Sequence, residues 1–193
     1  MKSLIILGGI LGAYAYIPLW KPLLKKVAEQ NFLTWALWAI LDAIATLSIL
    51  FQSGNFLLAA IFTLGSIVTA IIVLRSSNKP DWTWFEIMII VMIIICLTVW
   101  HRSGSRTATI ASTTALLLAS IPQLGDVWRN PQKTPTLPYV IWSLANFVTI
   151  WGGKNWSVEE RLYPVSALII CICITTISLR NIEVAPEGSV LPR

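Results

Sequence analysis

Residues 120–132 read SIPQLGDVWRNPQ and follow a long apolar run. Proline has no backbone N–H and its ring disturbs the preceding helical turn, so a helix that contains Pro122 bends there. Inside a bilayer such a bend is tolerated only where neighbouring helices or water satisfy the freed carbonyl group. The stretch therefore predicts a bent transmembrane helix that ends beside a cavity.

The composition of the 193-residue chain indicates an integral membrane protein. Hydrophobic residues make up 56% of the chain and charged residues only 12%, whereas soluble domains carry about 25% charged residues. The mean hydropathy is +0.74. The net charge of +5 fits membrane orientation better than nucleic-acid binding, because the chain has no room for a soluble basic domain.

The chain offers no pattern for metal, cofactor or nucleophile chemistry. Cys96, Cys171 and Cys173 lie in apolar runs without a C-x-x-C pair, and His101 is the single histidine. Such cysteines usually pack as small hydrophobic residues, and this set does not make a zinc site. The serines of RSGS at 102–105 have no accompanying base. We therefore expect no metal, no cofactor and no enzymatic activity.

Seven apolar runs approach the roughly 20 residues that a helix needs to span a bilayer. They cover residues 3–20, 32–52, 55–75, 82–100, 106–123, 137–153 and 162–180. Aromatic residues favour the membrane–water interface, and we assign to that belt Trp20, Trp82, Trp84, Trp100, Trp128, Trp151, Trp156 and Tyr163. The sequence thus predicts an all-α membrane protein with seven transmembrane helices.

The basic residues predict how these helices are oriented. One side holds five of them, namely Lys2, Arg102, Arg106, Lys154 and Arg161. The other side holds nine, namely Lys21, Lys25, Lys26, Arg75, Lys79, Arg129, Lys133, Arg180 and Arg193. Because the side richer in Lys and Arg faces the cytoplasm, we expect the N-terminus outside and the C-terminus in the cytoplasm. The compact loops favour a bacterial inner membrane.

An internal repeat links the first and second halves of the chain. Pro18 and Pro122 are 104 positions apart. The same offset aligns Lys25 with Arg129, Leu33 with Leu137, Trp35 with Tyr139, Trp38 with Trp142 and Asp42 with Asn146. Transporters are often built from such repeats. We expect two parallel three-helix repeats at 1–75 and 105–180, a linker helix at 76–104 and a polar, disordered tail at 181–193.

The second helix of each repeat carries aromatic and polar side chains on one face. Spacings of three and four residues place side chains on the same side of a helix. One such face holds Trp35, Trp38, Asp42 and Thr46, and its counterpart holds Tyr139, Trp142, Asn146 and Thr149. We predict that both faces line a path between the repeats, with the substrate-binding residues Trp35, Trp38, Asp42, Tyr139, Trp142 and Asn146.

Asp42 has about two apolar turns on either side of it. A carboxylate at that depth costs roughly 2.5–3.5 kcal/mol by insertion scales, so intramembrane acids usually face a cavity and serve a function. Desolvation disfavours the charged form of a carboxyl group, which suits Asp42 for binding a ligand or accepting a proton. The structural alternative is a hydrogen bond to a Ser or Thr of another helix.

The other predicted site residues also have structural alternatives. Asn146 could serve as a polar contact between packed helices. Trp38 and Trp142 could face lipid or the core instead of stacking on a flat or sugar-like ligand. Small and hydroxyl residues, among them Gly8 and Gly12 of the first span and many Ser and Thr of the fifth, either allow close helix packing or line a wet path.

The segment IPQLGDVWRNPQKTPTLPYVIW, residues 121–142, resembles the PQ-loop motif, in which a Pro-Gln pair ends one helix and a short basic loop leads into the next. With seven helices grouped as three, one and three, residues 1–180 are similar to the PQ-loop and MtN3/saliva transporters. That group includes the SWEET sugar transporters and cystinosin-like amino-acid exporters. The resemblance implies that Pro18, Pro122 and Gln123 are hinges, although Leu19 stands where the first motif would have Gln.

The resemblance also implies roles in transport. Asp42 is similar to the Asp that accepts the coupling proton in the cystine exporter, and Trp38, Trp142 and Asn146 resemble sugar-binding groups. In the sugar transporters, however, the binding Asn lies on the third helix of each triplet. We therefore predict an alternating-access transporter of a small neutral or cationic polar solute, such as a sugar, an amino acid or a riboside, with proton coupling through Asp42.

A competing interpretation is a receptor or sorting protein of the same fold that does not transport. The KDEL receptor is a relative of this kind, and a protein of that type would need basic residues in its cavity. The sequence shows no Lys or Arg deep in any span, so transport is favoured. The expected partners are the small solute, the lipid bilayer and protons. The sequence leaves a homo-oligomer open.

Overall fold

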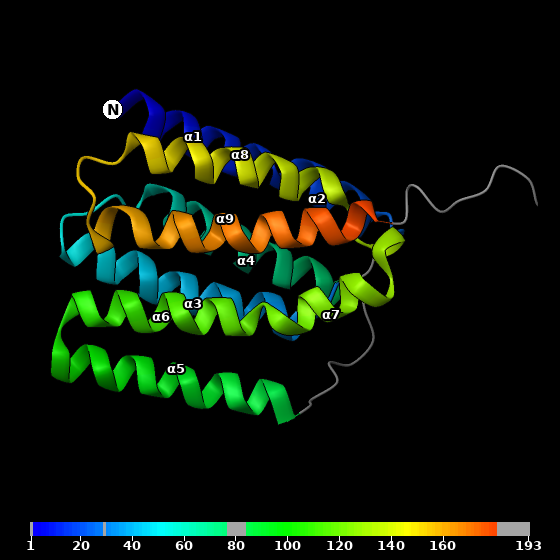
Figure 1. Ribbon diagram of the computed structural model, residues 1–193. Helices are drawn as coiled ribbons and strands as arrows, with labels where there is room; N and C mark the ends of the chain where they lie inside the picture. The colour runs from blue at the N-terminus through cyan, green and yellow to red at the C-terminus, as the bar shows by residue number, and fades with distance from the viewer. Residues whose placement is uncertain (1, 29, 77–83, 181–193) are drawn as a thin grey trace, which may run out of the picture.

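The computed structural model describes residues 2–28, 30–76 and 84–180, and every regular element within them is helical (Figure 1). The predicted tail, Trp82, Lys79 and Arg193 lie outside these residues. The elements are α1 (Lys2–Tyr14), α2 (Tyr16–Leu24), α3 (Phe32–Phe51), α4 (Leu57–Ser76), α5 (Trp84–Ser103), α6 (Ser105–Ala119), α7 (Ile121–Arg129), the 3₁₀ helix η1 (Pro131–Lys133), α8 (Thr136–Gly152) and α9 (Val158–Leu179).

Two of the long helices are interrupted beside a proline. The first is divided into α1 and α2 at Ala15, and another into α6 and α7 at Ser120. Pro18 and Pro122 follow these interruptions, and neither can donate to the carbonyl group four residues earlier. Figure 1 shows α7 turning away from the axis of α6. The interruptions stand where the sequence predicted bends. We count α1 and α2 together as one long helix, and α6 and α7 together as another. The described residues therefore form seven helices.

Five of the helices are long and apolar enough to cross a membrane: Lys2–Leu24, Phe32–Phe51, Leu57–Arg75, Ser105–Arg129 and Val158–Leu179. The sixth predicted span, α8, has 17 residues, and the described apolar part of α5 covers Ile87–Ser103. The lengths and composition of the five long apolar helices indicate an integral membrane protein.

The sequence placed the end of the fifth span at 123, whereas its helix continues as α7 to Arg129. Proline fits the first turn of a helix because the N–H that it lacks has no helical partner there. Pro122 therefore interrupts the span without ending it, and the predicted end was wrong.

The helices pack in a continuous pattern of neighbours. α3 lies along α4, and α8 lies along α9. α1 contacts both α4 and α8, while α6 contacts both α3 and α9. α5 lies at one edge of the bundle against α6 and α3 (Figure 1).

Glycines in α1 allow neighbouring helices to approach closely. A methyl group added at Gly8 would collide with Thr149 of α8, and one added at Gly12 would lie 2.7 Å from Leu58 Cδ1 of α4. These contacts are the close helix packing that small residues permit in membranes. The packing interpretation therefore holds for both glycines.

The buried hydroxyl group of Thr109 in α6 also serves packing. Thr109 Oγ1 donates to Ser48 Oγ of α3 at 3.1 Å and accepts a hydrogen bond from Gln52 Nε2 at 2.8 Å. Such polar contacts link adjacent helices inside a membrane. Thr109 therefore joins α6 to α3 and does not line either of the two cavities described below.

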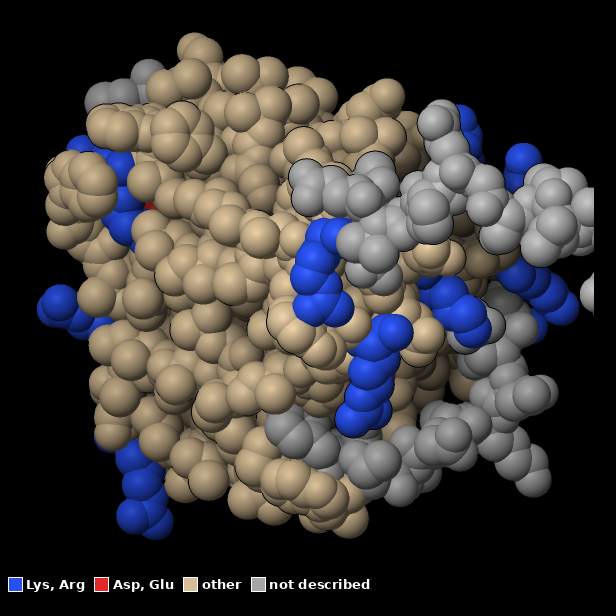
Figure 2. All heavy atoms as spheres, turned by 45° about the vertical axis from the view of Figure 1, so that its right-hand side comes forward, with Lys and Arg blue, Asp and Glu red and all other residues tan. Residues whose placement is uncertain are grey.

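Basic side chains lie toward the two ends of the bundle, with a broad surface free of Lys and Arg between them in the view of Figure 2. One end carries Lys2, the α5–α6 turn and the α8–α9 loop (Figure 1). The other end carries the C-terminal ends of α2, α7 and α9. We call this second end the basic end, because it holds Lys21, Lys25, Lys26, Arg75, Arg129, Lys133 and Arg180.

Candidate functional site

A cavity of about 50 Å³ lies among the helices in the middle of the bundle. We call it the central cavity. α2, α3, α4, α6, α8 and α9 all contribute to its wall. Its lining residues are Tyr16, Trp35, Trp38, Asp42, Phe62, Ser66, Leu116, Tyr139, Trp142, Tyr163, Ala167, Ile170 and Cys171. Five of the six predicted substrate-binding residues are therefore brought together around one space.

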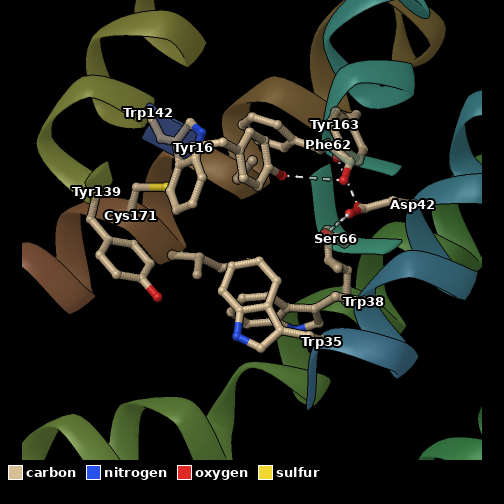
Figure 3. A pocket seen from close by; sticks show the side chains of 13 residues that line it. Tyr16, Trp35, Trp38, Asp42, Phe62, Ser66, Tyr139, Trp142, Tyr163 and Cys171 are labelled. Atoms are coloured by element: carbon tan, nitrogen blue, oxygen red, sulfur yellow. Dashed lines mark hydrogen bonds between the residues drawn. The ribbon is translucent and has the colours of Figure 1, made fainter. Parts of the chain in front are cut away.

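Asp42 supplies the carboxyl group of the central cavity. The side chain is only 4% exposed and sits in the middle of α3. Tyr163 Oη donates to Asp42 Oδ1 at 2.8 Å, and Ser66 Oγ donates to Oδ2 at 3.4 Å (Figure 3). The hydrogen bond to a serine of another helix, which was the structural alternative, is present. Asp42 is also a lining residue of the cavity, so both roles are compatible.

The two matched tryptophans differ in their polar contacts. Trp142 Nε1 donates to the carbonyl oxygen of Gly12 at 3.0 Å, and its ring packs edge-on against Tyr16 and Tyr139. Trp38 packs against Trp35, but its Nε1 is buried without a hydrogen-bond partner. Trp142 is thus held by both its ring and its indole N–H, whereas the indole N–H of Trp38, another lining residue, has no partner.

Tyr139 and Trp35, which the repeat aligned, also differ in their hydrogen bonds. The Tyr139 side chain is 1% exposed, and its hydroxyl group has no partner. Trp35 Nε1 instead donates to Gln30 Oε1 at 3.0 Å. A buried polar group without a partner costs about 1–3 kcal/mol, and native proteins retain few of them without a bound water or a functional reason. Tyr139 and Trp38 are therefore candidates for contact with a ligand.

Asn146 is the predicted site residue that does not line the central cavity. It is fully buried in α8, where its Nδ2 donates to the carbonyl oxygen of Trp142 at 2.8 Å. Asparagine often bonds to backbone of its own helix in this way. Its Oδ1 has no partner, so a role for Asn146 in binding stays a prediction that the lining of this cavity does not support.

Tyr163 is the main site residue that sequence reasoning misplaced. It was assigned to the interfacial belt, but it is 2% exposed and bonded to Asp42. The reason is that α9 begins at Val158, four residues before the predicted start at 162, so Tyr163 lies inside the helix. Ala167 and Cys171 follow at intervals of four residues and also line the cavity. That spacing was the signal for a shared face.

Tyr16 is a second lining residue that was not predicted. Its Oη donates to the carbonyl oxygen of Phe62 at 3.2 Å. Its ring lies against α4 at Gly65, where a methyl group would occupy the position of the ring. Gly65 therefore makes the space that Tyr16 fills, and a glycine in the middle of an apolar helix was the signal for this close approach.

A second and more polar cavity of about 270 Å³ lies at the basic end. We call it the vestibule, and its lining residues are Gln30, Asn31, Gln123, Asp126, Asn130, Lys133 and Thr134. Gln30 belongs to the vestibule and Trp35 to the central cavity, so the hydrogen bond between them joins the two walls. Gln123, a predicted hinge, is thus a buried residue of the vestibule wall.

Comparison of the chain with models of protein families, with curated proteins and with solved structures gave no match. We therefore infer the chemistry of the site from its own residues. Among the described residues that line the central cavity there is no Lys, Arg or His. Asp42 is thus a buried acid among aromatic rings without a basic residue in the same wall, an arrangement suited to binding a proton or a cation.

Proposed function

We propose that this protein is an alternating-access membrane transporter of a small neutral or cationic polar solute, with proton coupling through Asp42. The observation that carries the proposal is the buried acid Asp42, which lies in mid-helix and lines a cavity between two groups of helices. Intramembrane acids of this kind mark substrate and proton pathways. The resemblance to PQ-loop transporters points to the same activity.

Helix packing supports two parallel three-helix repeats joined by α5. The contact of α3 with α4 has a counterpart in α8 with α9, and that of α1 with α4 has one in α6 with α9. Between the proposed repeats, α1 contacts α8 just as α6 contacts α3. These pairs follow if residues 1–75 and 105–180 are related by an axis along the membrane normal. The central cavity then lies where the two repeats meet.

The two ends of the bundle differ in a way that supports alternating access. At the basic end the vestibule approaches the central cavity as far as Trp35 and Gln30. At the opposite end the α3–α4 loop packs tightly on α9. A methyl group at Gly54 would lie only 2.6 Å from the carbonyl oxygen of Glu159. We infer that the described conformation is closed at this opposite end and that the vestibule is an entrance.

The interruptions beside Pro18 and Pro122 support a hinge role. Residues at the ends of elements commonly absorb the backbone changes of domain closure. The parts of these helices beyond each interruption, α2 and α7, lead to the basic end, and Gln123 of α7 lines the vestibule. Movement of α2 and α7 would therefore widen or narrow the entrance.

The distribution of basic residues supports an orientation with the basic end in the cytoplasm. The N-terminus would then be outside and the C-terminus inside, in a bacterial inner membrane. A receptor of the same fold is not favoured, because the described lining of the central cavity includes no basic residue that could bind an anionic ligand.

Counterflow in sealed liposomes tests the proposal. The purified full-length protein is reconstituted into vesicles loaded with unlabelled glucose, alanine, lysine, adenosine or choline, and entry of the labelled solute is followed. We expect exchange of at least one solute by the wild-type protein and a much slower exchange in Asp42→Asn. Glu159→Gln, which changes an acid outside the lining of either cavity, should keep it. Wild-type entry no faster than in protein-free vesicles for every solute would contradict transport.

A further inference from the structure

We propose that the ligand of the central cavity is an organic ammonium ion that also carries a hydroxyl group, of the kind that choline represents. This inference deepens the proposed function, on which it rests, by naming the class of solute. Three features of the residues around the cavity carry it: the carboxyl group of Asp42 without a basic residue in the same wall, the aromatic wall, and two unpaired polar groups on Trp38 and Tyr139.

The charges of the cavity favour a cation without an acid group. Asp42 is the acidic residue of the wall, and no Lys, Arg or His accompanies it among the described lining residues. Burying an unpaired charge is costly, so a positive ligand beside Asp42 is favoured. A solute that also carries a carboxylate or phosphate would bring a second negative charge with no counter-ion. This reasoning disfavours amino acids and phosphorylated compounds.

The wall of the cavity is suited to an alkylated ammonium head group. Seven of its residues are aromatic: Tyr16, Trp35, Trp38, Phe62, Tyr139, Trp142 and Tyr163. Around the Trp142 ring, the centroids of Tyr16, Tyr139 and Phe62 lie at 4.9, 5.2 and 5.8 Å. Aromatic faces attract cations through their quadrupoles, and cages of such rings recognise quaternary ammonium groups. Of these rings, Tyr163 is bonded to Asp42 and its centroid lies 6.2 Å from that of Phe62, so the carboxyl group and these two rings would act on the same head group.

The unpaired indole N–H of Trp38 requires a hydrogen-bond acceptor on the ligand, and the unpaired hydroxyl group of Tyr139 can use the same one. Trp38 Nε1 can only donate a hydrogen bond, whereas Tyr139 Oη can donate or accept. Figure 3 shows the Tyr139 hydroxyl group on a different side of the lining from Asp42 and Ser66. An ammonium head near Asp42 and a hydroxyl group near Tyr139 would satisfy both parts of the wall. A hydroxyl oxygen can accept from Trp38 or Tyr139 without adding charge.

The size of the cavity fits a site that opens during transport. A volume of about 50 Å³ is small beside the roughly 300–1,000 Å³ of ordinary ligand pockets. Entry of an ammonium alcohol therefore requires the helices around Trp35 and Trp142 to separate. The hydrogen bond between Trp35 and Gln30 lies on the vestibule side of this space, so its release would connect the two cavities.

Three probes separate the features of the ligand. Choline has both the charge and the hydroxyl group, tetramethylammonium has only the charge, and 3,3-dimethyl-1-butanol has the shape of choline without the charge. Calorimetric titration of the purified full-length protein should show binding of choline and weaker binding of tetramethylammonium. The neutral alcohol should bind at least about tenfold more weakly than choline, because it loses the charge contact with Asp42 and the cation–π contacts with the rings. Equal affinity for choline and the neutral alcohol would overturn the proposal.

Two variants assign the contacts. Tyr139→Phe should weaken choline binding by up to about tenfold, the effect of one hydrogen bond, and leave tetramethylammonium unchanged. Tyr14→Phe, which removes an exposed hydroxyl group of α1, is the matched control. Asp42→Asn should weaken both cations, with Glu159→Gln as its control. Equal losses for both cations in Tyr139→Phe would contradict the hydroxyl contact, and an Asp42→Asn protein that binds choline normally would contradict the charge contact.

The outcomes distinguish this inference from the proposed transport function. Asp42-dependent counterflow of glucose, alanine, lysine or adenosine without choline binding would overturn the ligand class and keep the transporter. Selective choline binding without counterflow of any solute would keep the site and overturn transport. The comparison of the three probes on the wild-type protein needs no variant, so it remains decisive if Asp42→Asn fails to fold.

Discussion

The hydroxyl group of Tyr163 donates a hydrogen bond of 2.8 Å to Asp42, although 121 positions separate the two residues in the chain. Asp42 lies on α3 and Tyr163 on α9, so the bond connects the first half of the chain to the second at the wall of the central cavity. Hydrogen bonds to charged groups are shorter and stronger than neutral ones. This contact therefore positions the carboxyl group that the proposed function uses.

Tyr163→Phe removes that hydrogen bond while keeping the ring. We expect the free energy of unfolding to fall by about 1–3 kcal/mol, because the carboxyl group loses its shorter bond and stays buried. Thermal unfolding in detergent measures the loss. Tyr14→Phe removes a hydroxyl group from a side chain that is 55% exposed and should leave the melting temperature unchanged. Equal melting temperatures for both variants would show that the Tyr163 bond contributes nothing.

Gly65→Ala tests the contact between α4 and Tyr16. The new methyl group would take space occupied by the buried Tyr16 ring, and overpacking of this kind costs about 1–3 kcal/mol. Gly125→Ala is the matched control, because nothing lies within 4 Å of a methyl group at Gly125 in α7. There alanine should stabilise the helix by up to about 1 kcal/mol. We expect Gly65→Ala to lower the melting temperature and Gly125→Ala to raise it. Equal shifts in the two variants would contradict the described packing.

Pro122→Ala tests the hinge. Alanine restores an N–H that can bond to the Leu118 carbonyl group, so we expect α6 and α7 to become one continuous helix. Counterflow should slow severalfold, while binding of the transported solute in a titration should be nearly unchanged. Pro135→Ala, at the start of α8 rather than within a helix, should leave both quantities unchanged. A normal counterflow rate in Pro122→Ala would rule out the bend as a hinge.

The course of the helices could be predicted from the sequence because apolar runs and prolines act locally. The interruptions at Ala15 and Ser120 stand beside the two aligned prolines, and α3 has nearly the predicted ends. The spacing of Trp35, Trp38 and Asp42 was likewise sufficient to place them on one face. These are properties of a single helix, which periodicity describes well.

The rest of the site depends on how different helices meet, which periodicity does not encode. The offset of 104 residues aligned Asn146 with Asp42, yet Asn146 bonds to backbone of its own helix and Asp42 bonds to Tyr163 and Ser66. Tyr163 resembled an interfacial aromatic residue because its burial depends on where α9 begins and on what packs around it. Rotations and contacts between helices decided these positions.

The most direct test of the central claim is the pH dependence of counterflow in Asp42→Asn. Rates for the solute with the fastest exchange are measured between about pH 5.5 and about pH 7.5. Gel filtration and thermal unfolding establish that the variant is folded. We predict a rate that changes with pH in the wild-type protein and in Glu159→Gln, and any residual rate in Asp42→Asn that does not. An unaltered pH dependence in folded Asp42→Asn would contradict proton coupling through this carboxyl group.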